Sequence, residues 1–154
     1  MGLPERAFRQ IADGQTQEVL YIYQPDVDIF RAGREGDSKM TKLRYEEDDR
    51  PPPKRNDIVT YYVGNILKVK AGTGGISLYD GIDRNRRMGR TDRWWCIPGG
   101  AKMPKDIVIA KDAKPNASGL THYGVEPAMD MPLSDFIDKL KTFAEFMYLL
   151  RNHS

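Results

Sequence analysis

Between residues 57 and 127 the chain is a succession of short segments rich in Val, Ile, Tyr and Trp, separated by Gly, Pro, Asn or Asp. Runs of β-branched and aromatic residues that end at turn residues are typical of strands. Two similar segments, EVLYIYQ and VDIFRAG, come earlier in the chain. The pattern predicts a strand-rich core from segments 18–24, 27–33, 57–63, 66–72, 75–80, 93–98, 106–112 and 121–127.

The C-terminal segment follows a different period. In residues 132–151 apolar side chains recur every three or four positions, which predicts a long amphipathic helix with Asp130 or Ser134 as its N-cap. A length of 154 residues suits one globular domain spanning residues 1–154. We therefore expect an α+β fold in which the C-terminal helix packs on a strand-dominated core.

Two further segments remain, one after Pro4 and one at residues 33–56. After Pro4, the side chains of Phe8, Ile11 and Ala12 would share one helical face, which predicts a short N-terminal helix. Residues 33–56 contain three consecutive prolines and many charges, so we expect mostly loop there, with one helical turn near Met40–Tyr45 at most.

Composition excludes several classes of protein. The 24 basic and 22 acidic residues nearly cancel, so bulk charge does not indicate a polyanionic partner. A single cysteine cannot form an intramolecular disulfide, and one cysteine with two histidines does not make a typical zinc site. The acidic run 46–49 is typical of a solvated loop, so no metal is expected there either. The N-terminus lacks the apolar core of a signal peptide, and no stretch approaches the roughly 18 apolar residues of a membrane span. We expect a protein of the reducing, aqueous cytoplasm.

A glycine cluster precedes the predicted strand 75–80. A dinucleotide fingerprint places its glycines after a strand, so a Rossmann interpretation fails. The bare backbone of Gly74 and Gly75 can approach a ligand, and Ser77 and Tyr79 share one strand face that suits a ribose and a flat heterocycle. The alternative is an ordinary turn followed by a strand.

The segment from Arg84 to Trp95 places five arginines beside two tryptophans. Arginine binds phosphate and indole stacks on bases, so the segment could bind a nucleotide or nucleic acid. The alternative is a hydrated loop with Trp94 or Trp95 anchored in the core. Those arginines are Arg84, Arg86, Arg87, Arg90 and Arg93.

Two further residue types can carry chemistry. His122 lies in the predicted strand 121–127, where it would be either a structural hydrogen-bonding residue or a catalytic one. Cys96 follows two tryptophans in an apolar strand, which indicates a buried thiol rather than a nucleophile.

Several motifs stand in an unusual order: GGISLYD, then CIPGGAKMPKDIVIAKD, then THYGVEPAMDMP, then the amphipathic helix. This order resembles the small ADP-ribosyltransferase-like cytotoxic effectors of bacterial type VI secretion, a family with relatives in fungi. The resemblance covers about half of the chain and implies an ADP-ribosyltransferase-like fold that uses NAD. Arg31 in IFRAG resembles the arginine on the strand that opens many such folds.

The resemblance also implies roles for individual residues. Ser77 would brace the nicotinamide-side ribose, Arg31 would hold a phosphate or ribose, and Asp80 would close its strand. His122 and Tyr123 would stand where better-known ADP-ribosyltransferases have the acidic motif of the third strand, and His122 would be catalytic together with Ser77. We therefore expect the Ser77 and His122 side chains to converge from neighbouring strands, with Arg31 bordering the same cavity. The implied NAD-binding residues are Arg31, Gly74, Gly75, Tyr79, Asp80 and Tyr123.

The chain departs from better-known ADP-ribosyltransferases at the catalytic carboxylate. Thr121 and Tyr123 hold the positions where an acidic pair would lie. A carboxylate normally stabilises the oxocarbenium-like transition state. Three alternatives follow: His122 with Ser77 and backbone carbonyls orients NAD, Asp80 or Glu126 substitutes for the carboxylate, or the fold binds a nucleotide without turnover.

The expected function is that of an NAD-dependent toxin that transfers ADP-ribose to a cellular target or hydrolyses NAD. It would act in the cytosol of the attacked cell and be blocked by a cognate immunity protein. One alternative is a nucleic-acid-binding or ribonuclease-like toxin that uses the segment from Arg84 to Trp95 together with His122. A non-enzymatic interaction domain is the other.

Overall fold

The computed structural model describes residues 3–10, 16–82 and 92–150, which form eleven strands in two sheets and one helix. This arrangement confirms the predicted α+β class. In chain order the elements are β1 (Arg6–Gln10), β2 (Thr16–Ile22), β3 (Ile29–Arg34), β4 (Thr60–Val63), β5 (Ile66–Val69), β6 (Ile76–Tyr79), β7 (Asp92–Ile97), β8 (Ile107–Asp112), β9 (His122–Pro127), β10 (Met131–Pro132), α1 (Leu133–Glu145) and β11 (Tyr148–Leu149).

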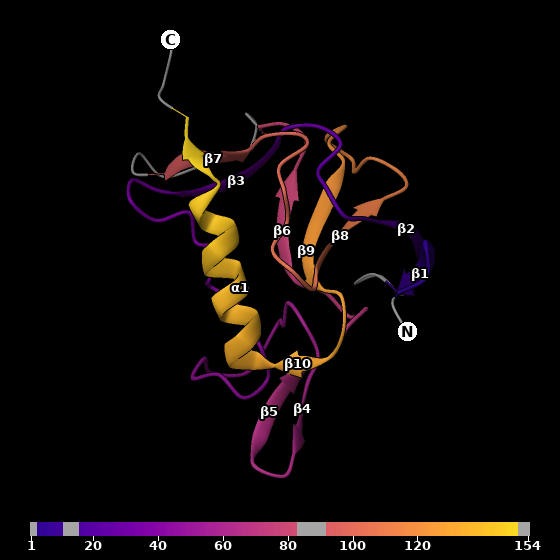
Figure 1. The fold of residues 1–154 in the computed structure, drawn as a ribbon, viewed down its shortest axis with the longest axis vertical. Coiled ribbons are helices and arrows are strands. Elements are labelled where there is room, and N and C mark those ends of the chain that lie inside the picture. Colours follow the sequence, from indigo (N-terminus) through magenta and orange to yellow (C-terminus); the bar gives the residue numbers. More distant parts are fainter. Residues whose placement is uncertain (1–2, 11–15, 83–91, 151–154) are drawn as a thin grey trace.

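The larger sheet has the strand order β1-β2-β8-β9-β6-β3-β7-β11, and the smaller sheet has the order β10-β5-β4. Helix α1 lies along one side of the larger sheet, and the hairpin β4–β5 projects below it (Figure 1). Phe136, Leu140 and Phe143 of α1 are fully buried and share one core cluster with Leu78 and Val125 of the central strands. Burying these side chains supplies the main favourable term in folding.

The larger sheet narrows between β6 and β3. These two strands share one register pair, Phe30 with Tyr79, whereas β3 pairs with β7 from Ile29 through Arg34. Strands β8, β9 and β6 pair over several residues each and form a continuous central block. The narrow junction leaves backbone groups of β6 free to bond with side chains from β3.

The predicted N-terminal helix is wrong. Residues 6–10 form strand β1, which pairs with β2 in antiparallel register from Arg6 with Leu20 to Gln10 with Thr16. The helical pattern was short, and a neighbouring strand edge offers backbone hydrogen bonds that outweigh a weak local preference. The Ile11 and Ala12 part of that prediction lies outside the described residues.

The C-terminal helix exists but is shorter than predicted. It ends at Glu145, and the chain then pairs as β11 with the edge strand β7. The predicted caps are also wrong, because Pro132 is the N-cap residue and makes no side-chain cap hydrogen bond. Asp130 instead accepts hydrogen bonds from the Tyr61 hydroxyl and the Ala71 amide. Among the described residues, no helix is long and apolar enough to cross a membrane.

The segment after β3 is loop and turn as predicted, with no helical turn near Met40. Met40 and Leu43 are nevertheless buried in the core cluster. Ion pairs within the loop, such as Arg50 with Asp48 at 2.6 Å and Arg44 with Asp57 at 2.7 Å, help to fix its path.

Strand β7 carries the tryptophans and the cysteine. Trp95 packs against the core cluster and donates a hydrogen bond from Nε1 to the Arg34 carbonyl at 2.9 Å, which confirms that one tryptophan anchors this strand. Cys96 is fully buried as predicted, and burial raises the pKa of its thiol. The arginine-rich residues 84–91 lie outside the described part of the chain.

Candidate functional site

The central strands β8, β9 and β6 bring several polar side chains onto one face of the sheet. The register pairs Tyr79 with His122 and Ser77 with Gly124. Because side chains alternate across a strand, Ser77, Tyr79 and His122 lie on the face opposite the buried Leu78 and Tyr123. We call this surface the site face.

His122 lies at the centre of the site face. Its Nε2 atom is 2.8 Å from Ser77 Oγ, within hydrogen-bonding distance. Its ring also meets the Tyr79 ring edge on, with centroids 5.4 Å apart and planes inclined at 63°. The contact with Ser77 confirms that the two side chains converge from neighbouring strands. A histidine in contact with a hydroxyl can exchange a proton with it or share a bound hydroxyl group.

Asp112, at the end of β8, also belongs to the site face. Its Oδ2 atom is 3.3 Å from Nδ1 of His122, on the other side of the ring from Ser77. The His122 and Asp112 side chains are 30% and 19% exposed, so solvent reaches both. Sequence reasoning missed Asp112. The alternation of strand 106–112 could place Asp112 on a face with Val108 and Ala110, but only the strand order shows that β9 lies beside it.

Arg31 contacts the backbone of Ser77, and the prediction that it borders the same cavity is corrected: Phe30 pairs with Tyr79, so the adjacent Arg31 starts on the opposite face, beside Trp95. Nη1 of Arg31 donates to the Ser77 carbonyl at 2.8 Å, and Nη2 donates to the Lys39 carbonyl at 3.1 Å. The bond to Ser77 crosses the narrow junction between β3 and β6, and the bond to Lys39 reaches the loop after β3. Arg31 therefore fixes the position of the strand that carries Ser77.

Gly74 and Gly75, just before β6, lie very close to the backbone of other segments. A Cβ atom on Gly74, where φ is +145°, would lie 1.9 Å from the Asp57 carbonyl oxygen. A Cβ atom on Gly75 would lie 2.1 Å from the Val125 carbonyl oxygen. Internal packing therefore requires glycine at both positions, and no bound ligand is needed to account for them.

Two other predicted binding residues lie apart from the His122–Ser77 contact. Asp80 accepts a hydrogen bond from the Thr121 amide at 2.9 Å and so closes the β6–β9 ladder. Tyr123 points into the core and donates to Asp26 at 2.8 Å. The prediction that Tyr123 lines the same site as His122 is corrected, because adjacent residues of one strand point to opposite faces.

Glu126 lies on β9 four residues beyond His122, on the same face of the strand, and is 1% exposed. Both of its carboxylate oxygens accept hydrogen bonds from the guanidinium of Arg9, which extends from β1. Arg9 also donates to the Tyr21 hydroxyl at 2.9 Å. The absence of side chains at Gly75 and Gly124 makes room for Glu126, since a Cβ on either would lie within 3.0 Å of its side chain.

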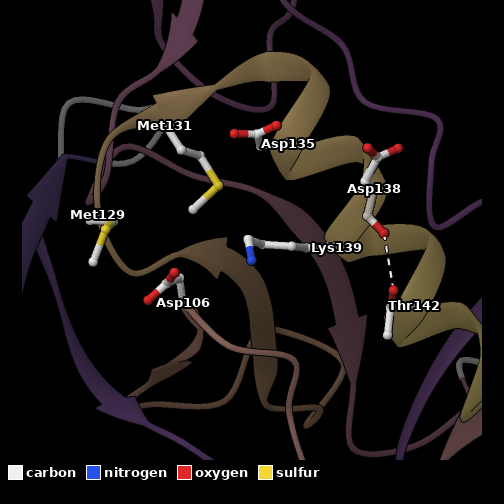
Figure 2. Close-up of a pocket in the computed structure, with 7 residues that line it drawn as sticks. All are labelled: Asp106, Met129, Met131, Asp135, Asp138, Lys139 and Thr142. Carbon is white, nitrogen blue, oxygen red and sulfur yellow. Dashed lines mark hydrogen bonds between the residues drawn. The ribbon is translucent and has the colours of Figure 1, made fainter.

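A separate cavity of about 410 Å³ lies between α1 and the chain around Asp106. Figure 2 shows Lys139 extending from α1 toward Asp106, with Asp135 and Asp138 on the same helix. Met129 and Met131 line the cavity as well, and neither Ser77 nor His122 does. Within the described part of the chain, no group of three or more His, Cys, Asp or Glu residues is arranged to hold a metal ion.

Residues 27–148 match the model of a family described as the Tse2 ADP-ribosyltransferase toxin. No curated protein matches the chain. The matched region includes β6, β8 and β9, and therefore Ser77, Tyr79, Asp112 and His122.

Proposed function

Since the chain belongs to the Tse2 ADP-ribosyltransferase toxin family, we propose that it binds NAD on the site face and either transfers the ADP-ribose to an acceptor or hydrolyses NAD. The observation that carries this proposal is the 2.8 Å contact between His122 Nε2 and Ser77 Oγ. It supports a catalytic role for two residues whose side chains meet in a solvent-accessible position.

The reaction breaks the bond between C1′ of the ribose and the nicotinamide nitrogen. The bonding electrons leave with nicotinamide, which departs uncharged, and an acceptor lone pair forms the new bond to C1′ while the acceptor loses a proton. The transition state has oxocarbenium character, so positioning and electrostatics supply most of the acceleration. His122 would take up the acceptor proton.

Ser77 and Tyr79 suit the parts of NAD next to the reacting bond. A serine hydroxyl has one proton and two lone pairs, so Ser77 can hold a ribose hydroxyl while it stays in contact with His122. The rings of Tyr79 and His122 offer an aromatic surface to the flat nicotinamide. Arg31 contributes indirectly by fixing the Ser77 backbone.

The carboxylates considered as substitutes for a catalytic glutamate already have partners. Glu126 uses both oxygens in its ion pair with Arg9, and Asp80 accepts the Thr121 amide. These contacts favour His122 and Ser77 over Asp80 or Glu126 as the catalytic residues.

As a toxin of ADP-ribosyltransferase type, the protein would act in the cytosol of an attacked cell, after delivery by type VI secretion. We further propose that a cognate immunity protein binds it and blocks access to the site face.

The proposal is tested by measuring nicotinamide release from NAD by the purified protein, with and without cell lysate. Release without lysate indicates hydrolysis, whereas release that needs lysate and labels a component of it indicates transfer. Ser77→Ala should reduce release by about 100-fold or more, and the control Ser134→Ala, at an exposed helix position, should not. If NAD is consumed in neither condition, the proposal is wrong and a non-enzymatic interaction domain is favoured.

A further inference from the structure

Asp112, His122 and Ser77 form a row across three neighbouring strands. Asp112 ends β8, His122 begins β9, and Ser77 lies in β6, so each side chain comes from a different hydrogen-bonded strand. The carboxylate faces Nδ1 at 3.3 Å and the hydroxyl faces Nε2 at 2.8 Å. The two ring nitrogens of His122 thus have partners of different chemistry.

We infer that Asp112 is a positioning residue that holds the His122 proton on Nδ1 and leaves the Nε2 lone pair facing Ser77. This inference rests on the proposed function of His122 and Ser77. An ionised carboxylate only accepts hydrogen bonds, so the nitrogen beside it is favoured as the protonated one. A neutral imidazole then has its acceptor at Nε2, and the Ser77 hydroxyl is the donor.

This tautomer has a chemical consequence for both partners. With its proton directed to His122, the Ser77 oxygen keeps its lone pairs available for a ribose hydroxyl. When Ser77 passes its proton to Nε2 and takes the acceptor's proton in exchange, the adjacent carboxylate of Asp112 stabilises the imidazolium that forms. The opposite tautomer would present an N–H to Ser77 and would leave no nitrogen lone pair on that side of the ring.

Other charged groups near β9 have different partners. Lys111 precedes Asp112 but points to the opposite face, where it binds Asp26. Glu126 is paired with Arg9. Of the residues that the structure describes, Asp112 is the acidic side chain paired with the His122 ring.

The test compares wild type with Asp112→Asn and Asp112→Ala by two readouts. The first is the ring ¹⁵N spectrum of His122 without NAD, assigned through loss of its signals in His122→Ala. Wild type should show the Nδ1–H tautomer, and both variants should shift toward Nε2–H. The second is nicotinamide release, for which kcat should fall about 10- to 100-fold while KM stays nearly constant, the loss typical of a residue that orients a histidine.

Asp26→Asn is the matched control, because Asp26 contacts Lys111 and Tyr123 on the opposite face of β8 and β9. It should leave the His122 tautomer and kcat unchanged even if it lowers the melting temperature. A wild-type spectrum dominated by Nε2–H, or folded Asp112 variants that keep the wild-type tautomer and kcat, would overturn the inference. The spectrum needs no substrate, so a wild type that does not turn over NAD contradicts the proposed function while the spectrum still decides the tautomer.

Discussion

Glu126 and Arg9 show how a buried charge can be structural on a face that also carries reactive groups. Burial alone would lower the pKa of Arg9, but its hydrogen bonds and charge interaction with Glu126 outweigh burial and raise the pKa. The guanidinium of Arg9 therefore stays charged and paired with Glu126. The pair joins β1 to β9. The carboxylate of Glu126, although only four residues from His122 in sequence, is therefore held by Arg9.

We expect Glu126→Gln to lower the free energy of unfolding by about 3–5 kcal/mol, because it leaves the largely buried guanidinium of Arg9 without its counter-charge. Urea denaturation measures this loss. Nicotinamide release per folded molecule should persist. If folded Glu126→Gln is inactive while His122→Ala and Ser77→Ala remain active, Glu126 is the catalytic carboxylate and the assignment of His122 is wrong.

The alternation of residues 75–80 and 121–127 predicts two strands and the faces of Ser77 and Tyr79. It could not predict which strands are neighbours, because strand order depends on long-range pairing. For that reason the sequence does not indicate Asp112. The N-terminal segment forms a strand because pairing with β2 overrides a weak local helical pattern. The C-terminal helix ends before the apolar period does, because Met147 packs in the core after the helix and β11 then pairs with β7.

The loop between β2 and β3 is held to the central strands by Asp26. Burial would raise the pKa of Asp26, but hydrogen bonds from Lys111 and Tyr123 outweigh it and lower the pKa below 3.8. Because the pKa of Asp26 is lower in the folded than in the unfolded protein, ionised Asp26 stabilises the fold at pH values above its unfolded-state pKa. This stabilisation is lost as the pH falls through the folded-state pKa.

Asp26→Asn should therefore destabilise the protein most near neutral pH. The difference in unfolding free energy from wild type should shrink as the pH falls below about 4. Urea denaturation at pH 7, 5 and 3 measures this trend. A difference that grows with acidity would contradict the ionic role of Asp26.

At the scale of the molecule, the part matched by the family runs from residue 27 to residue 148 and contains the site face. The hairpin β1–β2 precedes this part, yet it extends the same sheet beside β8 and supplies Arg9 to Glu126. Helix α1 covers the opposite face (Figure 1). The fold thus buries one face of the central strands for stability and leaves the polar row of Asp112, His122 and Ser77 accessible on the other.

In the proposed mechanism, His122 contributes to turnover rather than to the stability of the core. The most direct measurement is nicotinamide release at saturating NAD by His122→Ala, together with its melting temperature. We expect kcat to fall by about 100-fold or more. The melting temperature should stay within about 3 °C of wild type, because the His122 side chain is 30% exposed and removing it leaves little cavity. A variant whose melting temperature drops strongly, and whose activity per folded molecule stays at the wild-type level, would contradict it.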